Sequence, residues 1–197
     1  MRRSFLLLFF LCTSLLLFAQ KPVRFGDREV YLEANVRGKV RGHKTSSLEL
    51  GIPLGEKLNV LVQFGANKSS RQLLAKYGIE LGDYLGSNAY YATVKPGSRP
   101  SDFVGAGIRT VVPLRWEWKL PSGLLENNPP EWALVNGQLQ MSLTWFPTVN
   151  WSTIQRILEA SGITYNAPSE LFRSVKVLGT PEALVKVAAE EGVAVLT

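Results

Sequence analysis

Two short stretches of the chain, "LLAKYGIE" at residues 73–80 and "ILEASGIT" at residues 157–164, share one pattern. Each begins with an apolar pair in a short helical run, which stops at a glycine that isoleucine follows directly. Glycine in this place is typical of the left-handed residue that ends a helix. The match therefore indicates the same corner in two copies of one small unit.

The residues around the first stretch predict the order strand, helix, strand, helix, strand over residues 58–114. "LNVLVQF" is an apolar, β-rich run suited to a buried strand. Ser69 or Ser70 caps the helix that follows, and Gly78 ends it. The segments "SNAYYATV", "RPSDFVGAG" and "IRTVVPL" then predict a strand, a very short helix and a closing strand.

The same order starts again over residues 138–197. "QLQMSLTWF" alternates apolar and polar residues, which predicts a strand with one apolar face. Asn150 caps a helix that stops at Gly162, and Thr180 caps a second helix with Pro181 in its first position. The strands that follow these two helices are predicted in "LFRSVKVLG" and "VAVLT".

Two further segments lie outside these units. Residues 20–57 predict a leader strand and a connector, with Val30, Leu32 and Ala34 on one face of the strand. Residues 115–137 form a linker rich in tryptophan and proline.

This order of elements predicts an α+β fold made of two tandem ferredoxin-like sandwiches of the βαβαβ type, after a signal peptide and the short leader strand. Each unit alone buries little core. We therefore expect the two units and the linker to pack together.

The first residues, 1–19, have the layout of a secretory signal peptide. Arg2 and Arg3 precede an apolar core that is too short to favour a permanent membrane anchor. Cleavage near Ala19 predicts a secreted or periplasmic protein. A lipid anchor on Cys12 is the competing interpretation, although Leu11 is a poor fit to the small residue that a lipoprotein signal needs.

Cleavage there removes the single cysteine, so the mature chain has neither a disulfide nor a thiolate. It leaves 20 basic against 16 acidic side chains, a net charge of +4. Such a mildly basic surface lacks the strong excess of basic residues that is typical of nucleic-acid-binding proteins, so we expect no nucleic-acid partner.

Catalytic and cofactor sites are not indicated. The single histidine, His43, lies in a polar turn without a nucleophile motif nearby, and a zinc site of the usual ligand type cannot be assembled. The glycines of "DFVGAGIRT" fit a helix end better than a phosphate loop. We expect no metal and no cofactor, and a small hydrolase is a remote third alternative.

Five tryptophans cluster around the linker and the start of the second unit. They are expected chiefly in the core between the units, because tryptophan is enriched at buried contacts. The alternative is an exposed platform for a ligand, and Trp116, Trp118 and Trp132 are the candidate interface residues.

The segments "NVLVQFGANKSSRQLLAKYGIELGDYLGSNAYYATV", "PPEWA" and "VKVLGTPEALVKVAAEEGVAVL" together resemble the propeptide region of bacterial secreted subtilisin-like serine proteases. The likeness covers residues 58–197. It implies one or two ferredoxin-like propeptide units, which act as a folding template (an intramolecular chaperone) and then as an inhibitor of the protease. In this family one sheet face packs on helices of the catalytic domain, and the segment after the last strand lies in the substrate cleft.

The chain contains no Asp-Thr-Gly, His-Gly-Thr-His or Gly-Thr-Ser motif, so we expect it not to be an enzyme itself. It ends at the last predicted strand, before the segment that would enter the cleft. We expect either the front piece of a longer serine protease or a free-standing relative that acts in trans. The alternative function is a secreted module that binds another envelope protein or a glycan through its tryptophan-rich linker.

Overall fold

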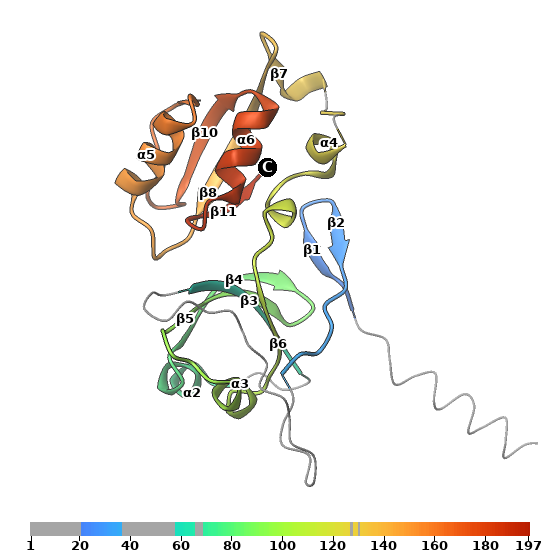
Figure 1. The fold of residues 1–197 in the computed structure, drawn as a ribbon, viewed down its shortest axis with the longest axis vertical. Coiled ribbons are helices and arrows are strands. Elements are labelled where there is room, and N and C mark those ends of the chain that lie inside the picture. The colour runs from blue at the N-terminus through green and yellow to red at the C-terminus, as the bar shows by residue number, and fades with distance from the viewer. Residues whose placement is uncertain (1–20, 37–57, 66–68, 127, 130) are drawn as a thin grey trace, which may run out of the picture.

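The computed structural model describes residues 21–36, 58–65, 69–126, 128–129 and 131–197. The predicted signal peptide, Cys12, His43 and most of the predicted connector lie outside these residues. Within them the protein has an α+β fold in which two similar units are stacked (Figure 1).

The first unit contains four strands and two helices in the order βαββαβ. They are β3 (Leu58–Phe64), α2 (Arg71–Lys76), β4 (Ile79–Gly86), β5 (Ala89–Val94), α3 (Pro100–Gly105) and β6 (Ile108–Pro113). The strands form an antiparallel sheet in the order β4-β5-β3-β6.

The second unit repeats this order of elements. They are β8 (Gln138–Trp145), α5 (Trp151–Ala160), β9 (Thr164–Tyr165), β10 (Ser174–Gly179), α6 (Pro181–Ala189) and β11 (Val193–Leu196). The sheet order is β11-β8-β10-β9, and a short strand β7 (Leu134–Val135) pairs with the start of β8. Numbered within its own unit, each sheet has the order 4-1-3-2 of a ferredoxin-like sandwich.

The α+β class is therefore confirmed, but the predicted βαβαβ order was one strand short in each unit. The missing strands are β4 and β9. β4 is an edge strand with glycines at 82 and 86, exposed residues and two register shifts, so it lacks the alternation that predicts a strand. β9 has only two residues, and β10 starts at Ser174, later than the predicted "LFRSVKVLG".

The matching corners are as the sequence predicts. Gly78 and Gly162 follow the first helix of each unit in the left-handed conformation, with φ of +73° and +67°. At the other end of these helices, the side chains of Ser70 and Asn150 accept hydrogen bonds from the backbone of the first turn. In both units, the second strand starts directly after this corner.

The leader is a hairpin and not a single strand. β1 (Val23–Phe25) pairs with β2 (Arg28–Val30) through a turn at Gly26 and Asp27. Leu32 is buried as predicted and Val30 is half-buried, but Ala34 is exposed.

Each sheet has helices on one face only. The helices α2 and α3 cover the face of the first sheet that is turned away from the second unit (Figure 1). Their core contains Val60, Val62, Phe64, Leu74 and Phe103. In the second unit, α5 and α6 cover a separate core under β8, β10 and β11.

The other face of the first sheet is mainly apolar, with Gln63, Thr93 and Thr110 as buried polar residues, and lies against the rest of the molecule. Leu61, Ala89 and Tyr91 on this face join residues of the hairpin and of the second unit in a third apolar cluster, which we call the seam. Its full set of buried members is Val23, Phe25, Leu32, Leu61, Ala89, Tyr91, Phe146 and Ala194. The seam therefore joins three segments that lie far apart in the sequence.

Phe146 is the main contribution of the second unit to the seam. Its ring packs edge-on against Tyr91 with the centroids 5.3 Å apart, and only 4% of the residue is exposed. At the rim, Arg173 pairs with Asp83 across the two units at 3.3 Å. Because exposed ion pairs contribute little, the apolar contact carries most of the stabilisation here.

We predict that Phe146→Ala lowers the free energy of unfolding by about 3–5 kcal/mol, because it leaves a cavity where the two units meet. Urea unfolding followed by circular dichroism measures the change. Phe172→Ala, at a residue that is 71% exposed, is the matched control and is expected to change stability by less than about 0.5 kcal/mol. Equal effects of the two substitutions would contradict the buried seam.

Candidate functional site

The predicted interface tryptophans lie in the linker. Trp116 and Trp118 belong to η2 (Trp116–Lys119), and Trp132 belongs to η3 (Glu131–Ala133), although its side chain is outside the described part of the chain. Trp116 is 38% exposed. Trp118 is half-buried, because its ring stacks on Phe25 of the hairpin at a centroid distance of 5.3 Å. The sequence did not indicate this contact between the linker and the leader.

The two remaining tryptophans belong to the second unit. Trp145 is buried in its core, and Trp151 packs beside it with the ring centroids 5.5 Å apart. Tyr165 of β9 also packs against Trp151, with the ring centroids at the same distance. These rings stabilise the second unit rather than the contact between the units.

Polar contacts fix the linker on both sides. Arg28 of the hairpin donates a hydrogen bond to the carbonyl of Glu117 at 2.9 Å. The Nζ atom of Lys119 donates to the carbonyl of Glu190, at the end of α6, at 2.8 Å. Within the three linker residues 117–119, one hydrogen bond thus connects the linker to the hairpin and another connects it to the second unit.

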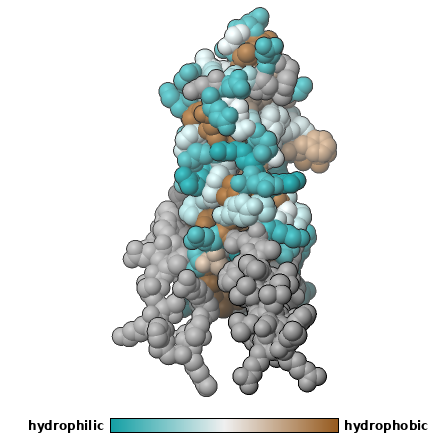
Figure 2. Space-filling model, turned by 90° about the vertical axis from the view of Figure 1, so that its right-hand side faces the viewer, coloured by the Kyte–Doolittle hydropathy of each residue, from teal (hydrophilic) through white to brown (hydrophobic). Residues whose placement is uncertain are grey.

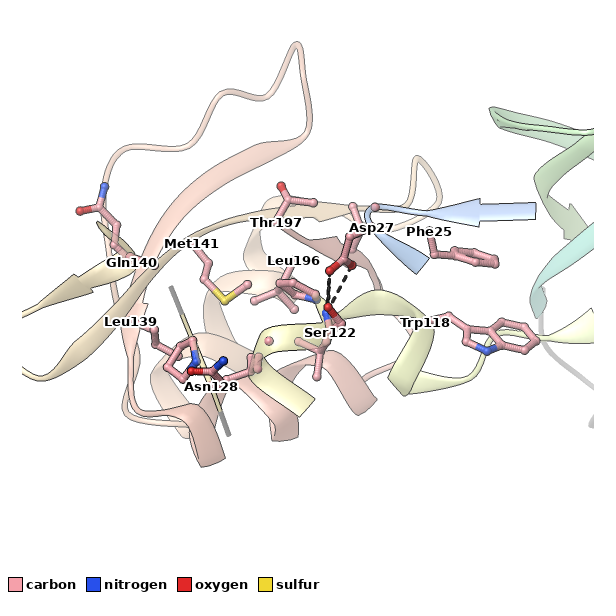
Figure 3. Close-up of a pocket in the computed structure, with 18 of the residues that line it drawn as sticks. Phe25, Asp27, Trp118, Ser122, Asn128, Leu139, Gln140, Met141, Leu196 and Thr197 are labelled. Atoms are coloured by element: carbon pink, nitrogen blue, oxygen red, sulfur yellow. Dashed lines mark hydrogen bonds between the residues drawn. The ribbon is translucent and has the colours of Figure 1, made fainter. Parts of the chain in front are cut away.

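A cavity of about 640 Å³ lies between the hairpin turn, the linker, β8 and β11. Phe25 and Trp118 lie at one end, and Leu139, Gln140 and Asn128 at the other (Figure 3). The linker residues Leu120 and Leu124, which are buried, also line it. The volume is within the range of small-molecule sites, which is about 300–1,000 Å³.

Asp27 is one of two acidic residues that line this cavity, and hydrogen bonds hold its carboxylate in place. Its carboxylate accepts hydrogen bonds from the backbone amide and the hydroxyl of Ser122, at the start of α4 (Ser122–Leu125), as the dashed lines in Figure 3 show. The hydrogen bond from the Ser122 hydroxyl is the main cause that holds the pKa of Asp27 below its usual value. The group is therefore ionised at neutral pH and has a defined orientation.

A second candidate surface is the outward face of the second sheet, opposite α5 and α6. Thr164, Gln140 and Lys176 are exposed there, and the small residues Ser142 and Thr144 between them are half-buried. By contrast, the corresponding face of the first sheet is mainly apolar and buried in the seam. The apolar residues Leu178 and Val195 lie on the same face of the second sheet as Gln140 and are half-buried. The second unit therefore presents a mainly polar face that the first unit does not have.

The side of the molecule with the hairpin and the linker has a mixed surface. In Figure 2, hydrophobic residues on this side form separate patches between hydrophilic ones. Monomeric proteins commonly expose patches of this kind, so they do not identify a docking surface by themselves.

The part of the chain that the structure describes offers few side chains that are arranged for catalysis or metal binding. No group of three or more His, Cys, Asp or Glu side chains there is placed to hold a metal ion. Gly105 is the last residue of α3 and Gly107 precedes β6, so the glycines of "DFVGAGIRT" mark a helix end. None of the described helices is both long and apolar enough to cross a membrane.

The comparisons with known proteins give one match. A family described as a domain of unknown function (DUF8729) matches residues 24–115. The match contains most of the hairpin and the whole first unit and ends where the linker begins, in agreement with the packing of the hairpin on the first sheet. No curated protein and no solved structure matches the chain.

Lys119 is the most unusual ionisable residue of the linker, because it is only 3% exposed. Burial lowers its pKa from 10.5 to about 8, and the nearby Glu191 and Glu190 oppose part of this shift. Between pH 8 and 10.5 the unfolded chain therefore binds more protons than the folded one, so stability rises with pH in this window. Below pH 8 the full cost of the buried charge is present.

We predict that Lys119→Met stabilises the protein at pH 7 by about 1–3 kcal/mol, because it removes this cost. The advantage over the wild type should shrink as the pH rises from 8 to 10.5. Urea unfolding at several pH values measures the difference, and Lys186→Met, at an exposed lysine in α6, corrects for the change in net charge. If the difference in the free energy of unfolding between Lys119→Met and the wild type does not vary with pH, the lowered pKa of Lys119 is contradicted.

Proposed function

We propose that this chain is a propeptide-type partner of a subtilisin-like serine protease, which it binds through the outward face of the second sheet. The strand order of both units supports this proposal, because it is the ferredoxin-like order that the sequence resemblance implies. The observation that carries the proposal is the polar outward face. It is the sheet face that the packing of the two units leaves for a partner.

The chemistry of this face suits helices on the partner. Ser142 and Thr144 are small, so a helix can approach the sheet closely along β8. Lys176, Gln140 and Thr164 around them supply hydrogen-bond donors and acceptors that fix the orientation. A polar face also remains hydrated before the partner arrives, which an apolar face of the same size would not.

The chain is secreted or periplasmic after removal of its signal peptide near Ala19, and it assists the folding of the protease or restrains its activity. The protease domain acts in cis or in trans. Both arrangements use the same sheet face.

The test is the inhibition of a subtilisin-like protease encoded in frame with this chain or beside it. The purified chain should slow hydrolysis of a peptide substrate and speed recovery of activity after acid denaturation. Lys176→Glu should weaken inhibition about tenfold or more, because it places the opposite charge inside the interface.

Lys186→Glu is the matched control, since it changes an exposed lysine on α6, behind the sheet. It should leave inhibition within about twofold of the wild type, as expected for a charge outside the interface. Equal loss in both variants, or no inhibition by the wild-type chain, would contradict the proposal.

The exposure of Trp116 favours a second candidate function, binding of a surface glycan or of another envelope protein by the linker. Aromatic rings that are open to solvent stack on apolar sugar faces. If this function holds, Trp116→Ala abolishes retention on a polysaccharide affinity gel, whereas Trp151→Ala, within the second unit, does not. Retention that is unchanged in Trp116→Ala would exclude the platform.

A further inference from the structure

The cavity beside the linker combines an apolar body with a polar mouth. Phe25, Trp118, Leu139, Met141 and Leu196 are among its apolar walls (Figure 3). A ligand that fills this space removes apolar surface from water on both sides of the contact, which favours binding. The body of a matching ligand is therefore an alkyl chain or a ring system.

The charges of the cavity have one sign. Asp27 and Glu131 line it, and both are exposed to solvent. No lysine or arginine is among the described residues that line it. This is unexpected in a chain whose formal net charge is +6, because basic residues outnumber acidic ones elsewhere. The cavity therefore favours a positive group and disfavours a carboxylate or phosphate.

Basic residues near the cavity in the sequence are held by other partners. Arg28 donates to the carbonyl of Glu117, and Arg115 pairs with the carboxylate of Glu117 at 3.2 Å. Lys119 points to the carbonyl of Glu190. Asp27 accepts its hydrogen bonds from Ser122, a neutral residue, and the neighbouring Arg28 offsets the charge of the carboxylate only in small part.

We propose that this cavity binds a small apolar cation, a molecule with an alkyl or aromatic body and an amine head group. The body lies between the linker and the apolar ends of β8 and β11. The head group lies at the mouth near Asp27. This site meets the outward face around Lys176 at Gln140, which belongs to both, but its occupancy does not depend on a protease.

The test uses three probes with one alkyl chain and different head groups: octylammonium, 1-octanol and octanoate. Isothermal titration calorimetry at pH 7 on the purified protein measures their affinities. We expect octylammonium to bind most tightly and octanoate most weakly. Within the alkylammonium series, each added methylene should strengthen binding by up to about fourfold until the cavity is full.

Two variants locate the site. Asp27→Asn should weaken octylammonium about fivefold, as expected for a partly exposed ion pair, and leave octanol unchanged. Glu170→Gln, an exposed carboxylate outside the cavity, is its control. Asn128→Trp, at an exposed position that lines the cavity, should weaken all three probes because the indole occupies the space.

Thermal unfolding of each variant shows whether the fold is retained. The proposal is overturned if octanoate binds as tightly as octylammonium, if Asp27→Asn and Glu170→Gln have equal effects, or if Asn128→Trp folds and binds normally. It is also overturned if no probe binds. Failure of protease inhibition has no bearing on these results.

Discussion

The structure depends on the fact that each of the two large sheets has two faces and its own helices cover only one of them. In the first unit the second face carries Leu61, Ala89 and Tyr91, which would be costly to expose to water. Phe146 and Ala194 of the second unit and the N-terminal hairpin cover this face. Burial of this one apolar face fixes the positions of the hairpin and of both units.

The same requirement explains the linker. Because the second unit covers the first sheet, the linker runs along the side of both units between the end of β6 and the start of β8. It is held there by the stack of Trp118 on Phe25 and by the hydrogen bond from Lys119 to Glu190. A cavity remains between the linker, the hairpin turn and the ends of β8 and β11. The cavity and the outward face of the second sheet are both consequences of this arrangement.

Much of this asymmetry was predictable from two short segments. "LNVLVQF" has consecutive apolar residues at positions 60–62 because β3 is buried on both faces, whereas "QLQMSLTWF" alternates because β8 is buried on one. The capped helices and the glycines at 78 and 162 follow from local chemistry and were predicted as well. Local patterns therefore indicated both units and the strand with a polar face.

Other features depend on contacts between distant residues and have no local pattern. β4 contains exposed residues and glycines, so only its pairing with β5 makes it a strand. The leader forms a hairpin because Val23 and Phe25 have the first sheet to pack on. The cavity is lined by segments from the hairpin, the linker and both ends of the second unit, so no single stretch of sequence indicates it.

We propose that a partner binds the outward face of the second sheet. The most direct measurement is the rate of maleimide labelling of single cysteines, since the chain has one cysteine, at position 12 in the predicted signal peptide. A cysteine at Lys176, on the face, and one at Ser152, on α5, are labelled with and without the protease domain. We expect strong protection of Lys176→Cys and unchanged labelling of Ser152→Cys. Protection of Ser152→Cys alone, or of neither in a complex that does form, would contradict it.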